Sequence, residues 1–332
     1  MAPTNKSSML MVICTKPLLV SILNQPRGIM QIWDPHFHIW DVRPNSPSGH
    51  DSAQLFAPDE DPIYTIQRYE ADLSMEGFEL IGGTFVEAVS VCHVEHDGPF
   101  FENSCIAEAR WVTDQCSQSK LPYQIVATGS LESPNWPSLF AQLQKIINVC
   151  GIRQILNHEP SWPRNHRLGN LLDSNNWQQG FSTLAEAGYS FDLQCNPHQY
   201  KQAAAIFQRN PRIPVILNHL GSPKREDLWE GQKYWEGMQA LANLEQVSIK
   251  LSMLTYPNKQ WHQDFLIKET VNKVIDLFGV HRCIFASNYP VEKLEGWDAQ
   301  SIYEEFQKLV DHRSEEEQEA LFASNAMRIY RA

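Results

Sequence analysis

The sequence has little positive charge, no closely spaced cysteine pairs and no long apolar run. Its 332 residues carry a formal net charge of −12, which argues against nucleic acid or an anionic membrane surface as the main partner. The seven cysteines are scattered without a Cys-x-x-Cys motif, which favours reduced thiols in a cytoplasmic protein over disulfides or a thiolate zinc site. No apolar stretch is long enough to cross a bilayer. The composition therefore predicts a soluble cytoplasmic protein with a small-molecule partner, and it leaves a homo-oligomer open.

Residues 1–29 precede the first regular pattern of the chain. The stretch 9–23 is fairly apolar, but Lys16 and Pro17 interrupt it, whereas a secretory signal has an unbroken apolar core. We therefore interpret residues 1–29 as an N-terminal extension of a single domain that covers residues 30–332. Neither an internal repeat nor an interdomain linker is visible in that domain.

Short apolar segments alternate with helical stretches from residue 30 onward. Segments such as 214–217 and 283–286 are continuously apolar, which is typical of strands buried on both faces of a parallel sheet. About eight strands, nearly all separated by helices, predict an α/β fold of the (β/α)8 TIM-barrel type. An open doubly wound sheet is the competitor, but no strand is followed by a Gly-x-Gly-x-x-Gly motif. The expected strands are 29–33, 80–88, 123–128, 151–156, 189–194, 213–219, 246–252 and 282–288.

Two histidines, His36 and His38, follow the first apolar run and are separated by one residue. Side chains alternate between the faces of a strand, so these two project together from a strand end. Two imidazoles on one side form half of a divalent-metal site. The motif alone is weak, because two surface histidines in a turn after Pro35 would have the same spacing.

In a barrel of this kind, the chemistry takes place at the carboxyl ends of the strands. Polar side chains occupy those ends in this sequence: His36 and His38, Glu87, His158, Asp192 with Gln194 and His198, His219, Lys250 with Ser252, and Asn288. Only 12 of the 332 residues are histidines, so their repeated occurrence at strand ends favours an active site over coincidence.

These residues lie in stretches that resemble the amidohydrolase superfamily. The resemblance is to its amidohydrolase-related branch of metal-dependent TIM-barrel hydrolases, which includes sugar and dicarboxylate lactonases. The matching stretches run in the family order, from Asp-Pro-His-Phe-His at 34–38 to Phe-Ala-Ser-Asn-Tyr-Pro at 285–290, with 83–88, 151–153, 191–194, 197–199, 217–221 and 247–252 between them. The ordered set is far more specific than the His-x-His motif.

The resemblance implies roles for several residues. His36, His38 and His219 match family histidines that hold a divalent metal in some members and contact the substrate in others, so zinc or manganese is the implied cofactor. His198 matches a strand-five histidine of the branch. The strand-eight residue is usually an aspartate that acts as general base, but here it is Asn288, whose amide does not accept a proton at neutral pH. An amide can still orient a water molecule or a substrate hydroxyl.

Without that aspartate, another group must act as the base. Glu87 is expected at the mouth of the second strand, where burial can raise its pKa toward the working range. His198 and His219 have suitable intrinsic pKa values. Of the three, we favour Glu87 or His198.

Arg153 and Lys250 are cationic candidates for binding a substrate carboxylate or a developing oxyanion, with Gln194 as a further substrate-binding residue. Since both cations lie inside strands, an equally good alternative is that they pair with Glu87 or Asp192 in the barrel core. The sequence leaves the two open.

The sequence therefore predicts a hydrolase of a small carbonyl compound, preferably a lactone of a sugar acid or dicarboxylic acid, with the carbonyl polarised by a metal or by the histidines. A metal-dependent decarboxylase is the second possibility, because it needs no water nucleophile and depends less on the missing aspartate. A non-catalytic barrel that binds a metabolite is the third, because Asn288 replaces the usual base.

Overall fold

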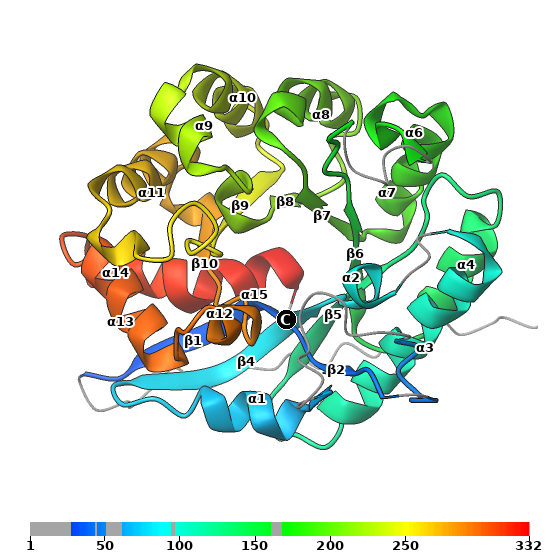
Figure 1. The fold of residues 1–332 in the computed structure, drawn as a ribbon, viewed down its shortest axis with the longest axis horizontal. Helices are drawn as coiled ribbons and strands as arrows, with labels where there is room; N and C mark the ends of the chain where they lie inside the picture. Colours follow the sequence, from blue (N-terminus) through cyan, green and yellow to red (C-terminus); the bar gives the residue numbers. More distant parts are fainter. Residues whose placement is uncertain (1–27, 44, 51–61, 94–96, 161–167, 332) are drawn as a thin grey trace, which may run out of the picture.

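The computed structural model describes residues 28–43, 45–50, 62–93, 97–160 and 168–331. Eight parallel strands form one sheet and follow one another around it in chain order, as the ring of arrows in Figure 1 shows. They are β1 (Met30–Phe37), β4 (Phe78–Val86), β5 (Tyr123–Thr128), β6 (Val149–Ile155), β7 (Ser190–Gln194), β8 (Val215–Leu217), β9 (Val247–Leu251) and β10 (Cys283–Phe285). The predicted (β/α)8 barrel is confirmed, and each expected strand overlaps an observed one.

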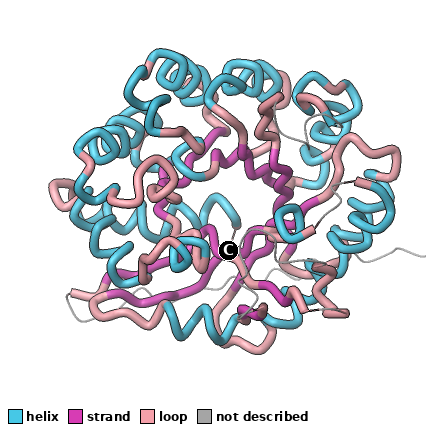
Figure 2. The backbone as a smooth tube through the Cα atoms, viewed as in Figure 1, coloured by secondary structure: helices cyan, strands magenta, loops and turns pink. Residues whose placement is uncertain are grey.

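Helices surround this ring of strands, as Figure 2 shows in cyan around magenta. They are α1 (Ile66–Asp72), α2 (Val89–Cys92), α3 (Gly98–Cys116), α4 (Trp136–Leu143), α6 (Asn175–Ser182), α7 (Leu184–Ala187), α8 (Tyr200–Gln208), α9 (Arg225–Glu230), α10 (Gln232–Ala242), α11 (Phe265–Phe278), α12 (Val291–Leu294), α13 (Ala299–Leu309), α14 (Glu315–Glu319) and α15 (Asn325–Tyr330). In the part of the chain that the structure describes, none of them combines the length and apolarity that a bilayer crossing requires.

Local sequence signals account for several helix ends. Gly188 follows α7 with a φ of 68°, the left-handed conformation that glycine adopts without steric cost. The side chains of Asp264 and Asp298 accept hydrogen bonds from the first turns of α11 and α13. Ser314 and Glu317 form a capping box at the start of α14.

Two short strands lie outside the barrel. β2 (Trp40–Asp41) pairs antiparallel with β3 (Ile63–Tyr64) and so joins the two ends of the long connection that follows β1. Most of that connection, residues 51–61, lies outside the described residues, as do residues 1–27 of the N-terminal extension.

The barrel closes between β1 and the residues that follow β10. Phe37 and Tyr289 form a parallel bridge. The backbone N–H of Asn288 donates to the backbone carbonyl of His36 at 2.9 Å, and the backbone N–H of His38 donates to the backbone carbonyl of Tyr289 at 2.8 Å. Closure therefore fixes the backbone of the His-x-His motif directly beside Asn288.

The core has two layers. The larger one lies between the sheet and the surrounding helices, and it contains most of the buried apolar side chains. The smaller one fills the barrel interior and consists of Trp33, Val86, Val126, Ile216, Ile284, Ala323, Ala326 and Tyr330. The last three come from the C-terminal segment, so α15 and the π-helical turn before it close one end of the barrel (Figure 1).

Candidate active site

Three histidines converge where β1 and β8 end. His36 is fully buried, and its ring centroid lies 4.9 Å from that of His38 and 4.4 Å from that of His219. His219 follows β8 after one intervening residue, Asn218, and begins a turn whose residues have positive φ angles. The structure thus brings His219 next to His36 and His38, although His36 and His219 are 183 positions apart in the chain. The predicted arrangement of the strands leads to this convergence.

Hydrogen bonds fix how these rings present their nitrogens. His38 Nδ1 lies 2.8 Å from the carbonyl oxygen of Val86, which only accepts, so Nδ1 carries the proton and Nε2 keeps its lone pair. His219 Nδ1 lies 3.0 Å from the Ser252 hydroxyl. His36 Nδ1 lies 3.2 Å from Nζ of Lys250, while its Nε2 is buried and has no partner among the described residues.

The environment keeps all three rings uncharged. Burial lowers the pKa of His38 to about 3 and places the pKa values of His36 and His219 well below the usual range. The positive charges of Arg153 and Lys250 lower all three pKa values further. At neutral pH, these histidines are therefore available to donate or accept one proton each.

Lys250 pairs with Asp192 inside the barrel. Its Nζ lies 2.5 Å from Asp192 Oδ1, and both side chains are fully buried. Asp192 also accepts from Asn218 Nδ2 at 3.0 Å and from the Tyr330 hydroxyl, 3.0 Å from each carboxylate oxygen. Burial lowers the pKa of Lys250, and the Asp192 carboxylate opposes that shift. A continuous polar column therefore connects His36 to the C-terminal helix.

Arg153 pairs with Glu87 across the barrel mouth. Its Nε donates to Glu87 Oε1 at 2.7 Å, and one terminal nitrogen donates to the Glu87 carbonyl at 2.6 Å. The other terminal nitrogen donates to Gln194 Oε1 at 3.1 Å. Glu87 also accepts from the Ser90 hydroxyl at 2.7 Å. Arg153 and Lys250 thus both pair with carboxylates in the barrel, as one of the two alternatives from the sequence predicts. Because Glu87 binds the Arg153 guanidinium, a role for Glu87 as general base is disfavoured.

His198 lies apart from this cluster. It is exposed in the short 3-10 turn Pro197–Gln199 that follows β7, whereas the other three site histidines are buried. Among the described residues, no hydrogen bond or ring contact joins it to them. Its predicted role as base stays a prediction, but the geometry offers it no route to their chemistry.

Asn288 has a neighbour that the sequence analysis missed. Its Nδ2 donates to Oε1 of Glu292 at 3.0 Å, and Glu292 is only 3% exposed. Burial raises the pKa of Glu292 to about 7. The four-residue spacing between Asn288 and Glu292, which suits a contact within a helical turn, is the sequence signal that could have indicated Glu292.

The implied metal does not match this side-chain arrangement. Among the described residues, no three His, Cys, Asp or Glu side chains are placed to hold an ion. The ammonium of Lys250 faces His36 Nδ1, which puts the proton of that ring on Nε2, the nitrogen a metal would need. Arg153 adds a second cation close by, and among the described residues the carboxylates of Glu87 and Asp192 are already paired with Arg153 and Lys250. The assignment of His36, His38 and His219 as ligands stays a prediction.

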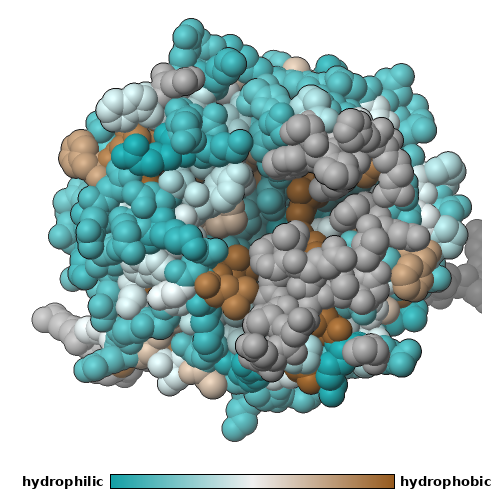
Figure 3. Space-filling model, viewed as in Figure 1, coloured by the Kyte–Doolittle hydropathy of each residue, from teal (hydrophilic) through white to brown (hydrophobic). Residues whose placement is uncertain are grey.

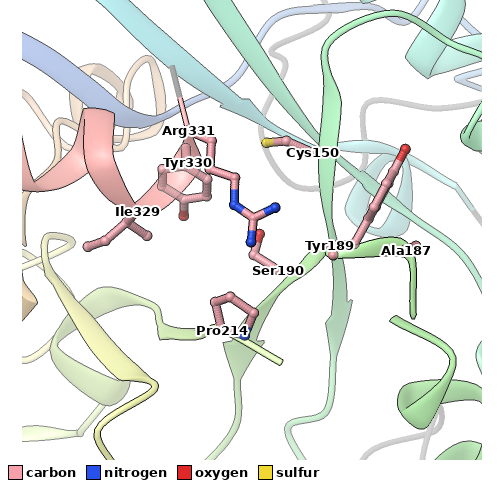
Figure 4. A pocket seen from close by; sticks show the side chains of 9 residues that line it. Cys150, Ala187, Tyr189, Ser190, Pro214, Ile329, Tyr330 and Arg331 are labelled. Carbon is pink, nitrogen blue, oxygen red and sulfur yellow. The ribbon is translucent and has the colours of Figure 1, made fainter. Parts of the chain in front are cut away.

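A small cavity of about 180 Å³ lies at the opposite end of the barrel. It is lined by residues where β6, β7 and β8 begin, together with the end of α15, and Figure 4 shows the Arg331 side chain pointing toward Ser190. This cavity is separated from the histidine cluster by the barrel core. The face drawn in Figure 3 is mainly hydrophilic, with small apolar groups near its centre and rim.

A ring of parallel strands with a histidine cluster at their carboxyl ends defines a protein of the (β/α)8-barrel class, with its candidate site where such barrels carry their active sites. More narrowly, the chain belongs to the amidohydrolase family, whose model matches residues 33–332. That match covers all the site residues described above and confirms the superfamily expected from the sequence.

Two proteins illustrate the sequence similarity. "Uncharacterized protein y4mH" of Sinorhizobium fredii is 30% identical over 311 residues, which cover 90% of this chain and 98% of that protein. The L-fucono-1,5-lactonase of Burkholderia ambifaria is 25% identical over 196 residues, which cover 57% of this chain and 62% of the lactonase.

Two solved structures illustrate the similarity of fold. A Burkholderia multivorans amidohydrolase with bound zinc has a TM-score of 0.69 and 19% identity, covering 91% of this chain and 99% of that one. A dihydroxybenzoic acid decarboxylase of Polaromonas with bound manganese has a TM-score of 0.62 and 13% identity, covering 92% of this chain and 97% of that one. At these identities the likeness concerns the fold, which accommodates zinc or manganese in those proteins.

Proposed function

We propose that this protein hydrolyses a small carbonyl compound, with a lactone of a sugar acid or dicarboxylic acid as the preferred class. The observation that carries the proposal is the cluster of three buried, uncharged imidazoles at the carboxyl ends of the strands. Partial similarity to an L-fucono-1,5-lactonase supports a lactone over an amide.

His36 and His38 are suited to opposite tasks. The Lys250 ammonium donates to His36 Nδ1, so the His36 proton lies on Nε2, which can donate to a substrate carbonyl oxygen and to the oxyanion that forms from it. His38 holds its proton on Nδ1 against Val86, so its Nε2 can take a proton from the attacking water. One ring polarises the carbonyl while the other accepts the proton.

The reaction then balances without a further reactant. The water oxygen bonds to the carbonyl carbon, the ring C–O bond breaks, and the proton taken by His38 passes to the leaving alkoxide to give a hydroxy acid. Arg153 uses three of its five N–H donors on Glu87 and Gln194. The two that remain suit a carboxylate on the substrate.

The test is a proton-release assay with five- and six-membered lactones of sugar acids and dicarboxylic acids. We expect the wild-type protein to open at least one of them, and His36→Asn or His38→Asn to lower kcat by roughly 100-fold, as expected for loss of an oxyanion donor or a base. His312→Asn is the matched control, because His312 is exposed on the surface. Failure to open any lactone, or unchanged activity in both site variants, would refute the proposal.

The same preparations separate the other two possibilities. Release of carbon dioxide from an aromatic or unsaturated acid would identify a decarboxylase, and ligand binding without turnover would identify a binding barrel. The Asn288→Asp variant helps here, since a gain in hydrolysis is expected only of a hydrolase.

Metal analysis tests the predicted ligands His36, His38 and His219. We expect hydrolysis to survive dialysis against a chelator, because His36 and His38 supply the polarising donor and the base. A metal-assisted reaction would instead be established by three results together. The wild type would bind about one zinc or manganese ion per chain, and the His36→Ala/His38→Ala variant would lose both the ion and the activity. Adding the metal back to the chelated wild type would restore its activity.

A further inference from the structure

The cavity at the end of the barrel opposite the histidine cluster is large enough for a small ligand. Its volume is about 180 Å³, and it lies where β6, β7 and β8 begin, beside the end of α15 (Figure 4). An engineered cavity of about 150 Å³ in another protein holds one benzene molecule, so this one has room for about six non-hydrogen atoms. The polar groups at its wall decide which kind of ligand it suits.

Ser190 contributes a buried hydroxyl to this wall. The residue is 4% exposed, and its Oγ has no hydrogen-bond partner among the described residues. Side chains two positions apart in a strand share a face, so Ser190 lies on the same inner face of β7 as Asp192. Gly151, its neighbour on β6, leaves room for the hydroxyl, because a Cβ there would lie 2.2 Å from Oγ. A buried hydroxyl without a partner is costly, so a ligand that accepts its proton would be stabilising.

Arg331 adds a positive charge that no other side chain balances. It caps the end of α15 with a φ of 54°, and its side chain points toward Ser190 (Figure 4). Among the described residues, its guanidinium has neither an ion pair nor a hydrogen bond, and it is the one charged group that lines the cavity. The chain has 39 acidic residues against 27 lysines and arginines, so a shortage of carboxylates does not explain an unpaired arginine.

The rest of the wall favours strong polar contacts with a ligand. Ala187, Pro214 and Ile329 are apolar, and apolar surroundings strengthen a hydrogen bond between a cation and an anion. The Tyr330 hydroxyl donates to Asp192 inside the barrel, so it does not compete for the ligand. Gly188 lets the guanidinium approach, since a Cβ there would lie 3.1 Å from Nη1 of Arg331.

We propose that this cavity is a binding site for a small oxyanion, either phosphate or a short carboxylate, held by the Arg331 guanidinium and the Ser190 hydroxyl. The planar guanidinium donates to two oxygens of such an anion side by side, and the hydroxyl donates to one of them or to a third. Arg331 is exposed, so the anion enters from solvent. The inference is independent of the proposed hydrolysis, because the barrel core separates this cavity from the histidine cluster.

The test is isothermal titration calorimetry of the full chain with inorganic phosphate, acetate and succinate, at an ionic strength held constant with chloride. We expect saturable binding of at least one anion, with a Kd of about 1 mM or lower. Arg331→Gln should weaken binding at least about tenfold, and Ser190→Ala by about threefold to tenfold, because a neutral donor contributes less than a charged one. Arg328→Gln is the matched control: Arg328 is exposed on the same helix and donates to the His281 carbonyl, so its loss should leave the Kd unchanged.

Thermal unfolding shows whether the variants keep their fold. Without an anion, Ser190→Ala should be at least as stable as the wild type, because it removes an unsatisfied buried hydroxyl. The anion should raise the thermal midpoint of the wild type more than that of either variant.

Two results would overturn the proposal. One is the absence of saturable binding of all three anions up to about 10 mM. The other is anion binding that survives Arg331→Gln, because the anion would then lie at another cation, such as Arg153 at the barrel mouth. Binding of phosphate without the carboxylates, or the reverse, would support the site and identify its anion.

Discussion

At the residue scale, the barrel holds two ion pairs, Lys250–Asp192 and Arg153–Glu87, whose side chains are buried. Lys250 and Asp192 form such a pair at 2.5 Å, with both side chains fully buried. The attraction between them compensates for the loss of hydration only while both partners are present. The same contact places an ammonium against His36, so this pair affects both stability and the protonation of the site.

We expect Lys250→Met to lower the free energy of unfolding by about 3–5 kcal/mol, because it leaves the Asp192 carboxylate buried without a cation. Denaturant unfolding measures the loss. Lys201→Met is the control, since Lys201 pairs with Glu236 on the surface and should contribute less than about 1 kcal/mol. Equal losses in the two variants would contradict the importance given to the buried pair.

The pH dependence of stability should also reflect Glu292. Its folded-state pKa of about 7 exceeds that of an unfolded chain, so the folded protein binds more protons between about pH 4.5 and 7. Stability is therefore lost as pH rises through that range, by roughly 3 kcal/mol in total. Glu292→Gln should be more stable than wild type at pH 8 and gain no such advantage at pH 4. A constant difference between the two proteins across this range would disprove the assignment.

At the element scale, the turn after β8 holds His219 in place. His219, Leu220, Gly221 and Ser222 all have positive φ angles, and Gly221 has a φ of 85°. A Cβ at Gly221 would lie 2.1 Å from the Tyr200 hydroxyl oxygen, which itself donates to the Gly221 carbonyl. The position therefore requires glycine both for its backbone conformation and for the close approach of Tyr200.

Gly221→Ala should lower stability by about 2–4 kcal/mol and reduce hydrolysis, because relief of the contact moves the turn that carries His219. Gly296→Ala is the matched control: its φ of 91° imposes a similar backbone strain, but nothing lies within 4 Å of the added Cβ. Thermal unfolding of both variants separates the contact from the strain. The same loss in each would mean that Tyr200 plays no part.

At the scale of the whole molecule, the barrel is complete within the described residues. β1 begins at Met30, the ring closes between β1 and the residues after β10, and the C-terminal segment fills one end of the interior. The family match begins at residue 33. These observations support the proposal that residues 1–29 are an extension and residues 30–332 the domain.

Removal of residues 1–27 should therefore leave the thermal midpoint within about 2 °C of the full chain and leave the hydrolysis rate unchanged, because every barrel strand and site residue that the structure describes is kept. Differential scanning calorimetry and the lactone assay on both lengths provide the comparison. A drop of more than about 5 °C would show that the N-terminal residues belong to the domain.

The sequence by itself determined the barrel and the strand ends that form the site. Strands such as 215–217 are apolar on both faces, and this local pattern is enough to identify a buried parallel strand. Once the strands are known, the carboxyl ends follow, and with them the convergence of His36, His38 and His219. Each of these inferences depends on residues close together in the chain.

Only the tertiary structure decided which charged groups meet. The pairs Arg153–Glu87 and Lys250–Asp192 join residues 66 and 58 positions apart, and sequence spacing does not distinguish such pairs from free cations. His198 was expected in the site yet is exposed, while Glu292 was not expected there and is buried beside Asn288. Burial and pairing arise from the packing of distant elements against one another, and that packing keeps His36, His38 and His219 uncharged.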